Sequence, residues 1–123
     1  MKNFGSLIIL DCLDVNENLN NRYHLDEFID DLVKLMDMKK VGRPSVEWFE
    51  DNEFNRSRDL IGYSYCQIIS LSSITIHCCS LSRRMYIDLF TCCNVNDIMI
   101  QQIQDILRSH FNPRVINLQL IDR

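Results

Sequence analysis

The sequence predicts an α+β fold, specifically a two-layer α/β sandwich with a mostly antiparallel sheet and two helices on one face. Two segments repeat apolar residues at helical spacing, whereas several others alternate apolar and polar residues with a period of two. The predicted strands follow one another in a run and outnumber the helices, which favours this class over an alternating βαβ fold. With 123 residues, 46% of them hydrophobic, the chain suits a single domain over residues 1–123.

The first predicted elements are a buried strand and an amphipathic helix. Residues 7–10 form the apolar strand, and an asparagine-rich loop follows it. Residues 24–40 carry apolar side chains at helical spacing, with acids near the start and lysines at the end, as the helix dipole prefers. The stretch "GRPS", residues 42–45, is predicted to break this helix.

The middle of the chain predicts consecutive strands. Residues 45–49 suggest a short strand, residues 50–59 a long charged loop, and residues 60–70 another strand. Residues 72–78 and 83–91 both alternate with period two and predict a hairpin.

A second helix and a last strand complete the fold. We expect the helix over residues 94–110, capped by Asn94 or Asn96, and the strand within residues 111–122. The predicted order is therefore β-α-β-β-β-β-α-β.

Charge and composition exclude some classes of function. The net charge is −4 and no basic cluster exceeds Arg83-Arg84, so no nucleic acid is expected as a partner. The longest apolar run near the N-terminus has four residues, which predicts no membrane span and no secretory signal. We therefore expect a cytoplasmic protein whose six cysteines are reduced.

Residues 70–93 concentrate serine, cysteine and histidine in the predicted hairpin. For each of them alone, packing in a sheet is the ordinary explanation. Zinc binding is an alternative whose ligands would come from His77, Cys78, Cys79, Cys92 and Cys93. It is disfavoured because adjacent cysteines in a strand point to opposite faces and because no C-x-x-C motif is present. No G-x-S-x-G motif supports a serine hydrolase. Strand alternation places His77 away from the isoleucine side of its strand.

The same segment resembles the prokaryotic S-adenosylmethionine decarboxylase proenzymes. Their pattern E-S-H-[IL]-[ST]-I-H-T-W-P-E is similar to "LSSITIHCCSL", and their [AV]-D-[VIL]-F-T-C-G to "IDLFTCC", with the same spacing. The likeness extends to "GSLIILDCLD", "LDEFIDDLVKL", "IGYSYCQIIS" and "HFNPRVINLQLIDR". It covers most of the chain outside residues 40–60.

The resemblance implies a self-made pyruvoyl cofactor and assigns four residues. Ser72 would attack the preceding carbonyl, so that the chain splits at Leu71-Ser72 into residues 1–71 and 72–123 and Ser72 becomes a pyruvoyl group. His77 matches the processing histidine and Ser64 its helper hydroxyl. The pyruvoyl group would form a Schiff base with the substrate amine and draw electrons during decarboxylation. Cys92 matches the proton donor.

Several positions depart from the family pattern. Leu71 replaces the glutamate before the cleavage serine, Ser73 replaces a histidine, and Tyr65 and Cys93 each replace a glycine. Leu81 replaces the carboxylate that holds the nucleoside ribose in relatives, a loss that we expect to cost roughly a few kcal/mol of binding.

Three functions therefore remain open. The first is an S-adenosylmethionine decarboxylase of spermidine and polyamine biosynthesis, with the ribose held by another residue. The second is a pyruvoyl-dependent decarboxylase of another amino acid, arginine or ornithine. The third is an uncleaved, non-enzymatic relative that acts as a binding or regulatory protein.

The resemblance also bears on the partners of the chain and on contacts to a purine. The resemblance implies a small-molecule substrate and a homodimer of processed protomers. The sequence does not decide whether Trp48, Phe49 or Phe54 would stack on a purine, because each also suits a core or loop position.

Overall fold

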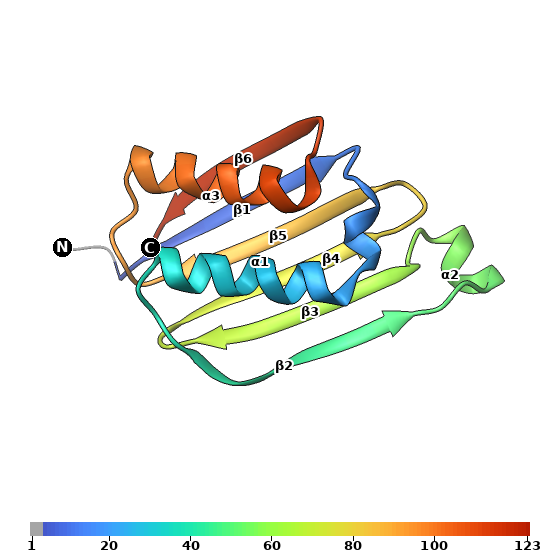
Figure 1. Ribbon diagram of the computed structural model, residues 1–123, viewed down its shortest axis with the longest axis horizontal. Coiled ribbons are helices and arrows are strands. Elements are labelled where there is room, and N and C mark those ends of the chain that lie inside the picture. The colour runs from blue at the N-terminus through green and yellow to red at the C-terminus, as the bar shows by residue number, and fades with distance from the viewer. Residues whose placement is uncertain (1–3) are drawn as a thin grey trace.

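The computed structural model describes residues 4–123 and contains one six-stranded sheet with helices packed on one face (Figure 1). The elements in chain order are β1 (Ser6–Leu13), the 3-10 helix η1 (Glu17–Asn20), α1 (Arg22–Leu35), β2 (Lys40–Phe49), α2 (Glu53–Ser57), β3 (Gly62–Ile69), β4 (Ser72–Cys79), β5 (Arg84–Thr91), α3 (Asp97–Phe111) and β6 (Val115–Asp122). The sheet order is β2-β3-β4-β5-β1-β6, and every neighbouring pair is antiparallel. The predicted α+β sandwich is confirmed. Residues 1–3, at the start of the predicted domain, lie outside the described residues.

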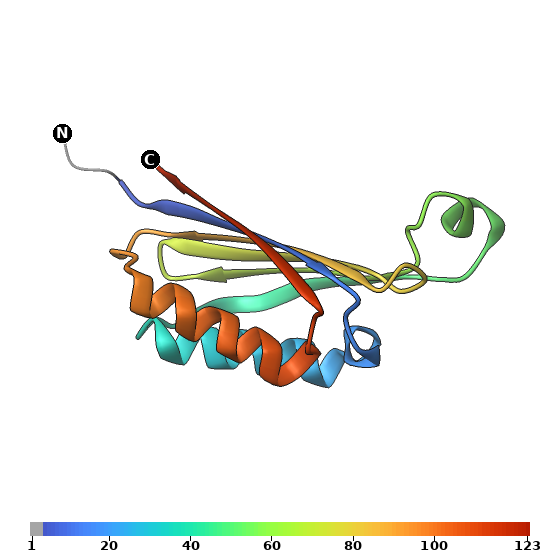
Figure 2. The same ribbon diagram turned by 90° about the horizontal axis from the view of Figure 1, so that it is seen from above.

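The two long helices lie side by side on one face of the sheet and leave the opposite face uncovered (Figure 2). Alternation along the strands explains this layering, since β4 buries Ile74, Ile76 and Cys78 toward the helices and turns Ser73, Thr75 and His77 outward. We call the side without helices the open face. None of the helices in residues 4–123 combines the length and apolar character that crossing a bilayer needs.

The core fills the layer between the helices and the sheet. Its fully buried side chains come from the sheet-facing sides of α1 and α3 and from the helix-facing sides of the central strands. The largest include Phe28, Phe111, Ile8, Leu10, Ile76 and Met85. At about 25 cal/mol per Å² of apolar area removed from water, a core of this kind supplies the main stabilisation of the fold.

Asparagine side chains start the helices. Asn21 accepts a hydrogen bond from the amide of Tyr23 at the start of α1, and Asn96 accepts one from Met99 at 2.8 Å at the start of α3. Of the two caps predicted for the second helix, Asn96 is therefore the correct one. Asn112 ends α3 in a left-handed conformation with φ of 41°, which asparagine tolerates better than most residues.

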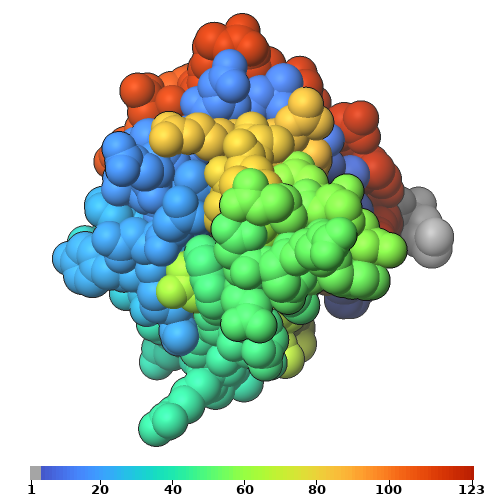
Figure 3. Space-filling model, turned by 90° about the vertical axis from the view of Figure 1, so that its right-hand side faces the viewer, coloured from blue at the N-terminus to red at the C-terminus, as the bar shows by residue number. Residues whose placement is uncertain are grey.

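The sequence prediction was wrong in the region between α1 and β3. The stretch 42–45 is not what ends the first helix, because α1 already ends at Leu35. It lies inside β2, where a register shift between Val41 and Ser45 accommodates Pro44 in an edge strand. The predicted loop 50–59 contains the short helix α2, capped by Asn52. This segment extends beyond the end of the sheet, and residues 50–61 lie beside the β4–β5 loop (Figure 3).

Candidate functional site

Ser72 lies directly after a tight turn and opens β4. The turn between β3 and β4 contains only Ser70 and Leu71, since Ile69 pairs with Ser72. Ser70 takes a left-handed conformation with φ of 47°, which is unfavourable for a residue with a side chain. Leu71 is 73% exposed, whereas Ser72 is only 4% exposed. The Leu71-Ser72 bond therefore joins an exposed turn to a buried strand start.

Ser72 and Cys92 are in contact. The backbone amide of Cys92 donates a hydrogen bond to Ser72 Oγ at 3.2 Å, and the hydroxyl faces Cys92 Sγ at 3.9 Å. Cys92 follows the end of β5 and lines a cavity of about 200 Å³ with Gly5, Ser6, Cys93, Asn94, Val95 and Asp122. The serine oxygen is thus held in one orientation beside a thiol that borders a cavity.

Gly5 allows the chain to pass close to Cys92. A Cβ atom added at Gly5 would overlap the carbonyl oxygen of Thr91 and lie 3.0 Å from the Cα of Cys92. Any other residue would therefore push β1 away from this end of β5. The glycine in the opening motif "GSLIILDCLD" signals this close approach.

Ser64 and His77 form a second pair on the open face. They are direct partners across β3 and β4, and Ser64 Oγ lies 3.0 Å from His77 Nδ1. Either group can donate the shared proton, according to the tautomer of the ring. Antiparallel pairing thus explains why a serine and a histidine thirteen positions apart meet.

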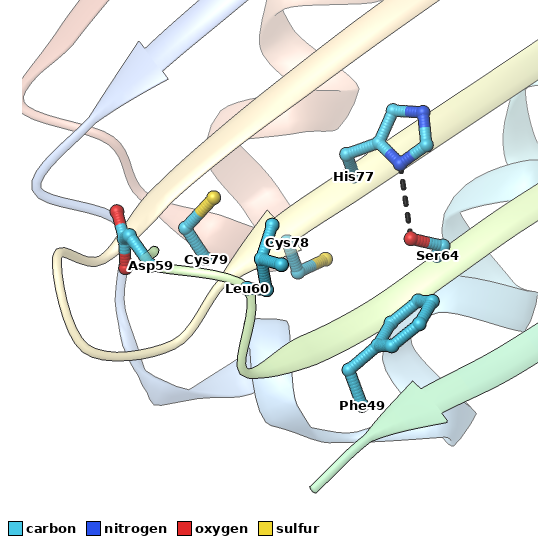
Figure 4. A pocket seen from close by; sticks show the side chains of 7 residues that line it. All are labelled: Phe49, Asp59, Leu60, Ser64, His77, Cys78 and Cys79. Atoms are coloured by element: carbon cyan, nitrogen blue, oxygen red, sulfur yellow. Dashed lines mark hydrogen bonds between the residues drawn. The ribbon is translucent and has the colours of Figure 1, made fainter. Parts of the chain in front are cut away.

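The Ser64-His77 pair borders a cavity of about 250 Å³ at the α2 end of the sheet. The residues lining it are Phe49, Asp59, Leu60, Ser64, His77, Cys78 and Cys79 (Figure 4). In Figure 4 the Ser64-His77 pair and Phe49 lie toward one end of this cavity and Asp59 lies at the other, with Leu60 between them. Sequence reasoning missed Asp59, because nothing in the pattern of the charged segment 50–59 distinguishes it from its neighbours.

The four residues assigned by resemblance form two separate pairs within one chain. Ser72 and His77 lie five positions apart on the same strand, so their backbones are about 16 Å apart. Their side chains also differ in direction, since Ser72 is buried and His77 faces the open side. His77 therefore does not reach the Leu71-Ser72 bond of its own chain.

The cysteines differ in environment, which bears on the zinc alternative. Burial raises the pKa of the Cys12 thiol and of the Cys78 thiol from 9.0 to about 12 in each case, so both remain protonated near neutral pH. Cys78 points into the core while the neighbouring His77 faces the open side. Cys92 and Cys93 lie at the opposite end of β4 and β5. The five candidate ligands are thus spread over two ends and two faces of the sheet.

The residues that depart from the family pattern lie in different parts of the structure. Tyr65 is buried and donates its hydroxyl to Asp26 Oδ1 of α1 at 2.6 Å, which ties the helix to the sheet. Cys93 Sγ lies 2.9 Å from Thr91 Oγ1. Leu81 lies in the β4–β5 loop and is 48% exposed. No carboxylate occupies position 81, and the one that lines the nearby cavity belongs to Asp59.

Comparison with known proteins bears on the fold and on the family. The structure is similar to the adenosylmethionine decarboxylase from Aquifex aeolicus VF5, with a TM-score of 0.75, 19% sequence identity, and coverage of 100% of this chain and 92% of that one. A search of curated proteins found no match. The family model described as S-adenosylmethionine decarboxylase matches residues 6–123, nearly the whole chain. The chain therefore belongs to the S-adenosylmethionine decarboxylase family.

Proposed function

We propose that this chain is a pyruvoyl-dependent S-adenosylmethionine decarboxylase that cleaves itself at Leu71-Ser72 into residues 1–71 and 72–123. The family consists of decarboxylases that use a pyruvoyl group on a small-molecule substrate. The decarboxylated product would serve as the aminopropyl donor in spermidine synthesis. The observation that carries the proposal is the position of Ser72, held against Cys92 directly after a two-residue turn.

The chain's own residues account for the cleavage chemistry. Ser72 Oγ attacks the carbonyl carbon of Leu71 and displaces the amide nitrogen, which leaves an ester between the two parts of the chain. Elimination releases the carboxylate of Leu71, and addition of water expels ammonia, so that residue 72 ends as pyruvoyl. The left-handed backbone at Ser70 holds the turn in an unfavourable conformation, and cleavage would release it.

The surroundings of Ser72 fit the group that would replace it. The new terminus would lie at the start of β4, beside Cys92 and within reach of the cavity that Cys92 borders. When present, the pyruvoyl carbonyl supplies an electron sink for loss of carbon dioxide from an amino acid. The sulfur of Cys92 lies close to this position, which suits the thiol to protonate the α-carbon of the product. Ser6 and Asp122 add polar groups to the same cavity.

A second copy of the chain would complete the site. Ser64 and His77 border a cavity but lie about 16 Å along the strand from the start of β4 in their own chain. We propose a homodimer in which the open faces of two sheets meet, so that the Ser64-His77 pair of one chain assists cleavage in the other. Ile68 and Phe49 are exposed on the open face, at 55% and 42%, and such an interface would cover them.

Release of carbon dioxide from carboxyl-labelled substrates tests the activity. The proposal predicts release from S-adenosylmethionine and none from arginine or ornithine. Ser72→Ala should abolish release, because no pyruvoyl group can form. Asp105→Ala, on the exposed side of α3 and away from the open face, is the control and should retain activity. Release from arginine or ornithine alone would instead support a decarboxylase of another amino acid, and no release from any of them would support a non-enzymatic relative.

A further inference from the structure

Asp59 carries a carboxylate oxygen without a hydrogen-bond partner beside the Ser64-His77 cavity. Ser82 Oγ donates to Asp59 Oδ2 at 2.5 Å, whereas Oδ1 is buried and has no partner among the described residues. A buried carboxylate oxygen without a donor is costly, and such groups in native proteins usually receive a hydrogen bond. Oδ1 is shielded from solvent in this conformation, so a ligand in the cavity that Asp59 lines would supply the missing donor once the carboxylate turns toward it.

The charge around Asp59 favours a neutral donor over a cation. Burial raises the pKa of the Cys79 thiol, the negative charge of Asp59 raises it further, and Arg84 lowers it. Arg84 pairs with Cys79 across β4 and β5, so a positive charge already lies near the Asp59 carboxylate that acts on this thiol. Hydroxyl groups can satisfy the remaining lone pairs without bringing in a second positive charge.

The rest of the cavity suits an aromatic or aliphatic body. Leu60 lines it between Asp59 and the Ser64-His77 pair, and Phe49 lines it beside that pair (Figure 4). The ring of Phe49 offers a flat apolar surface on which a base can stack. A ligand with an apolar ring and neighbouring hydroxyls, as in a nucleoside, matches this combination of walls.

The backbone places Asp59 beside the loop that contains Leu81. The amide of Ser80 donates to the carbonyl of Ile61 at 2.8 Å, and Ser82 reaches Asp59 directly. Residues 59–61 and 80–82 are therefore joined on both sides of Leu81. Asp59 brings a carboxylate to the neighbourhood of the position where the family pattern has one and this chain does not.

We propose that Asp59 is the specificity-determining carboxylate that receives the vicinal hydroxyls of the substrate's ribose in this cavity. The inference rests on the proposed function, because it assigns the nucleoside contact of that same site. The last side-chain torsion of aspartate is soft, so a rotation of the carboxylate suffices to turn Oδ1 from its buried position toward the hydroxyls.

The test is calorimetric binding of adenosine and of 2′,3′-dideoxyadenosine to the purified full-length protein. Asp59→Asn keeps an oxygen for Ser82 and removes the charge, so adenosine binding should weaken by about 10- to 100-fold. The unsubstituted protein should bind adenosine more tightly than the dideoxy compound by a similar factor, and Asp59→Asn should lose this preference. Asp51→Asn is the control, since Asp51 is exposed and pairs with Arg56 on the α2 segment.

A second variant separates a lost ligand contact from a disturbed loop. Adding Leu81→Glu to Asp59→Asn returns a carboxylate to this end of the cavity and should restore the preference for adenosine. Equal binding of both compounds by the unsubstituted protein, no binding of either, or no effect of Asp59→Asn would each overturn the inference.

Failure of the inference is distinguishable from failure of the proposed function. Carbon dioxide release by a self-cleaved chain whose KM for S-adenosylmethionine does not respond to Asp59→Asn would overturn the inference and leave the decarboxylase standing. Hydroxyl-dependent adenosine binding by a chain that never cleaves would uphold the role of Asp59 in nucleoside binding and overturn the decarboxylase.

Discussion

Mixing two inactive variants tests whether the site is shared between two chains. The first is Ser72→Ala, which lacks the attacking oxygen, and the second is His77→Ala, which lacks the assisting ring. In one chain the five-residue spacing along β4 places the two positions about 16 Å apart. The His77 of a Ser72→Ala chain can therefore serve the intact Ser72 of a His77→Ala partner.

The expected yield follows from random pairing. Production of both variants in equal amounts in one cell gives about half mixed dimers, so about half of the His77→Ala chains should cleave. Each variant produced alone should stay intact or cleave far more slowly. Different tags on the two variants allow gel electrophoresis to show which chain is cut, and only the His77→Ala chain should be cut.

Two results would refute this reasoning. The first is that His77→Ala chains stay intact although mixed dimers are present. Mixed dimers are demonstrated when affinity capture of one tag also recovers the chain with the other tag. The second is cleavage of His77→Ala alone at the rate of the unsubstituted protein, which would mean that the ring does not assist at all. Ser64→Ala should behave like His77→Ala in the mixture, because the two side chains share one hydrogen bond.

Three further predictions concern the turn, the buried thiols and the helix cap. Leu71→Glu restores the glutamate of the family pattern at an exposed position, so it should speed self-cleavage in a time course while changing the unfolding free energy by less than about 0.5 kcal/mol. The folded-state pKa of Cys12 and of Cys78 is raised from 9.0 to about 12, so the unfolded state loses thiol protons first as pH rises. The stability that these two protonated thiols contribute is therefore fully present below pH 9.0, and the unfolding free energy from urea titrations should fall between pH 9.0 and about 12. The fall should be less steep in Cys12→Ala. An equally steep fall in that variant would contradict the raised pKa of Cys12. Asn96→Ala removes the acceptor for the Met99 amide and should lower the unfolding free energy by about 1 kcal/mol, whereas an unchanged urea midpoint would count against the cap.

The sequence predicted the layers and most strands because their patterns are local. The alternation in β4 and β5 and the four-residue connection 80–83 set the hairpin, whose register pairs Cys79 with Arg84. Helical spacing likewise predicted the two long helices. The edge strand β2 was harder to predict, because a strand with a register shift and both glycine and proline resembles a loop in composition.

The candidate site could be predicted only in part. Motif spacing singled out four residues, and pairing across the sheet explains why Ser64 meets His77 and Ser72 meets Cys92. The separation of the two pairs follows from strand rise and alternation, but it becomes evident only once the register and the open face are known. Asp59 has no sequence signal, since its position depends on how the α2 segment folds back against the β4–β5 loop.

Intact-mass spectrometry of the purified protein tests the central claim most directly. We expect two chains, residues 1–71 and residues 72–123, with the second lighter by one ammonia than a chain that begins with serine. A single full-length mass that persists on long incubation would contradict self-cleavage at Leu71-Ser72 and with it the pyruvoyl mechanism. Two chains whose second part retains the serine mass would contradict the mechanism as well, because they would indicate simple hydrolysis.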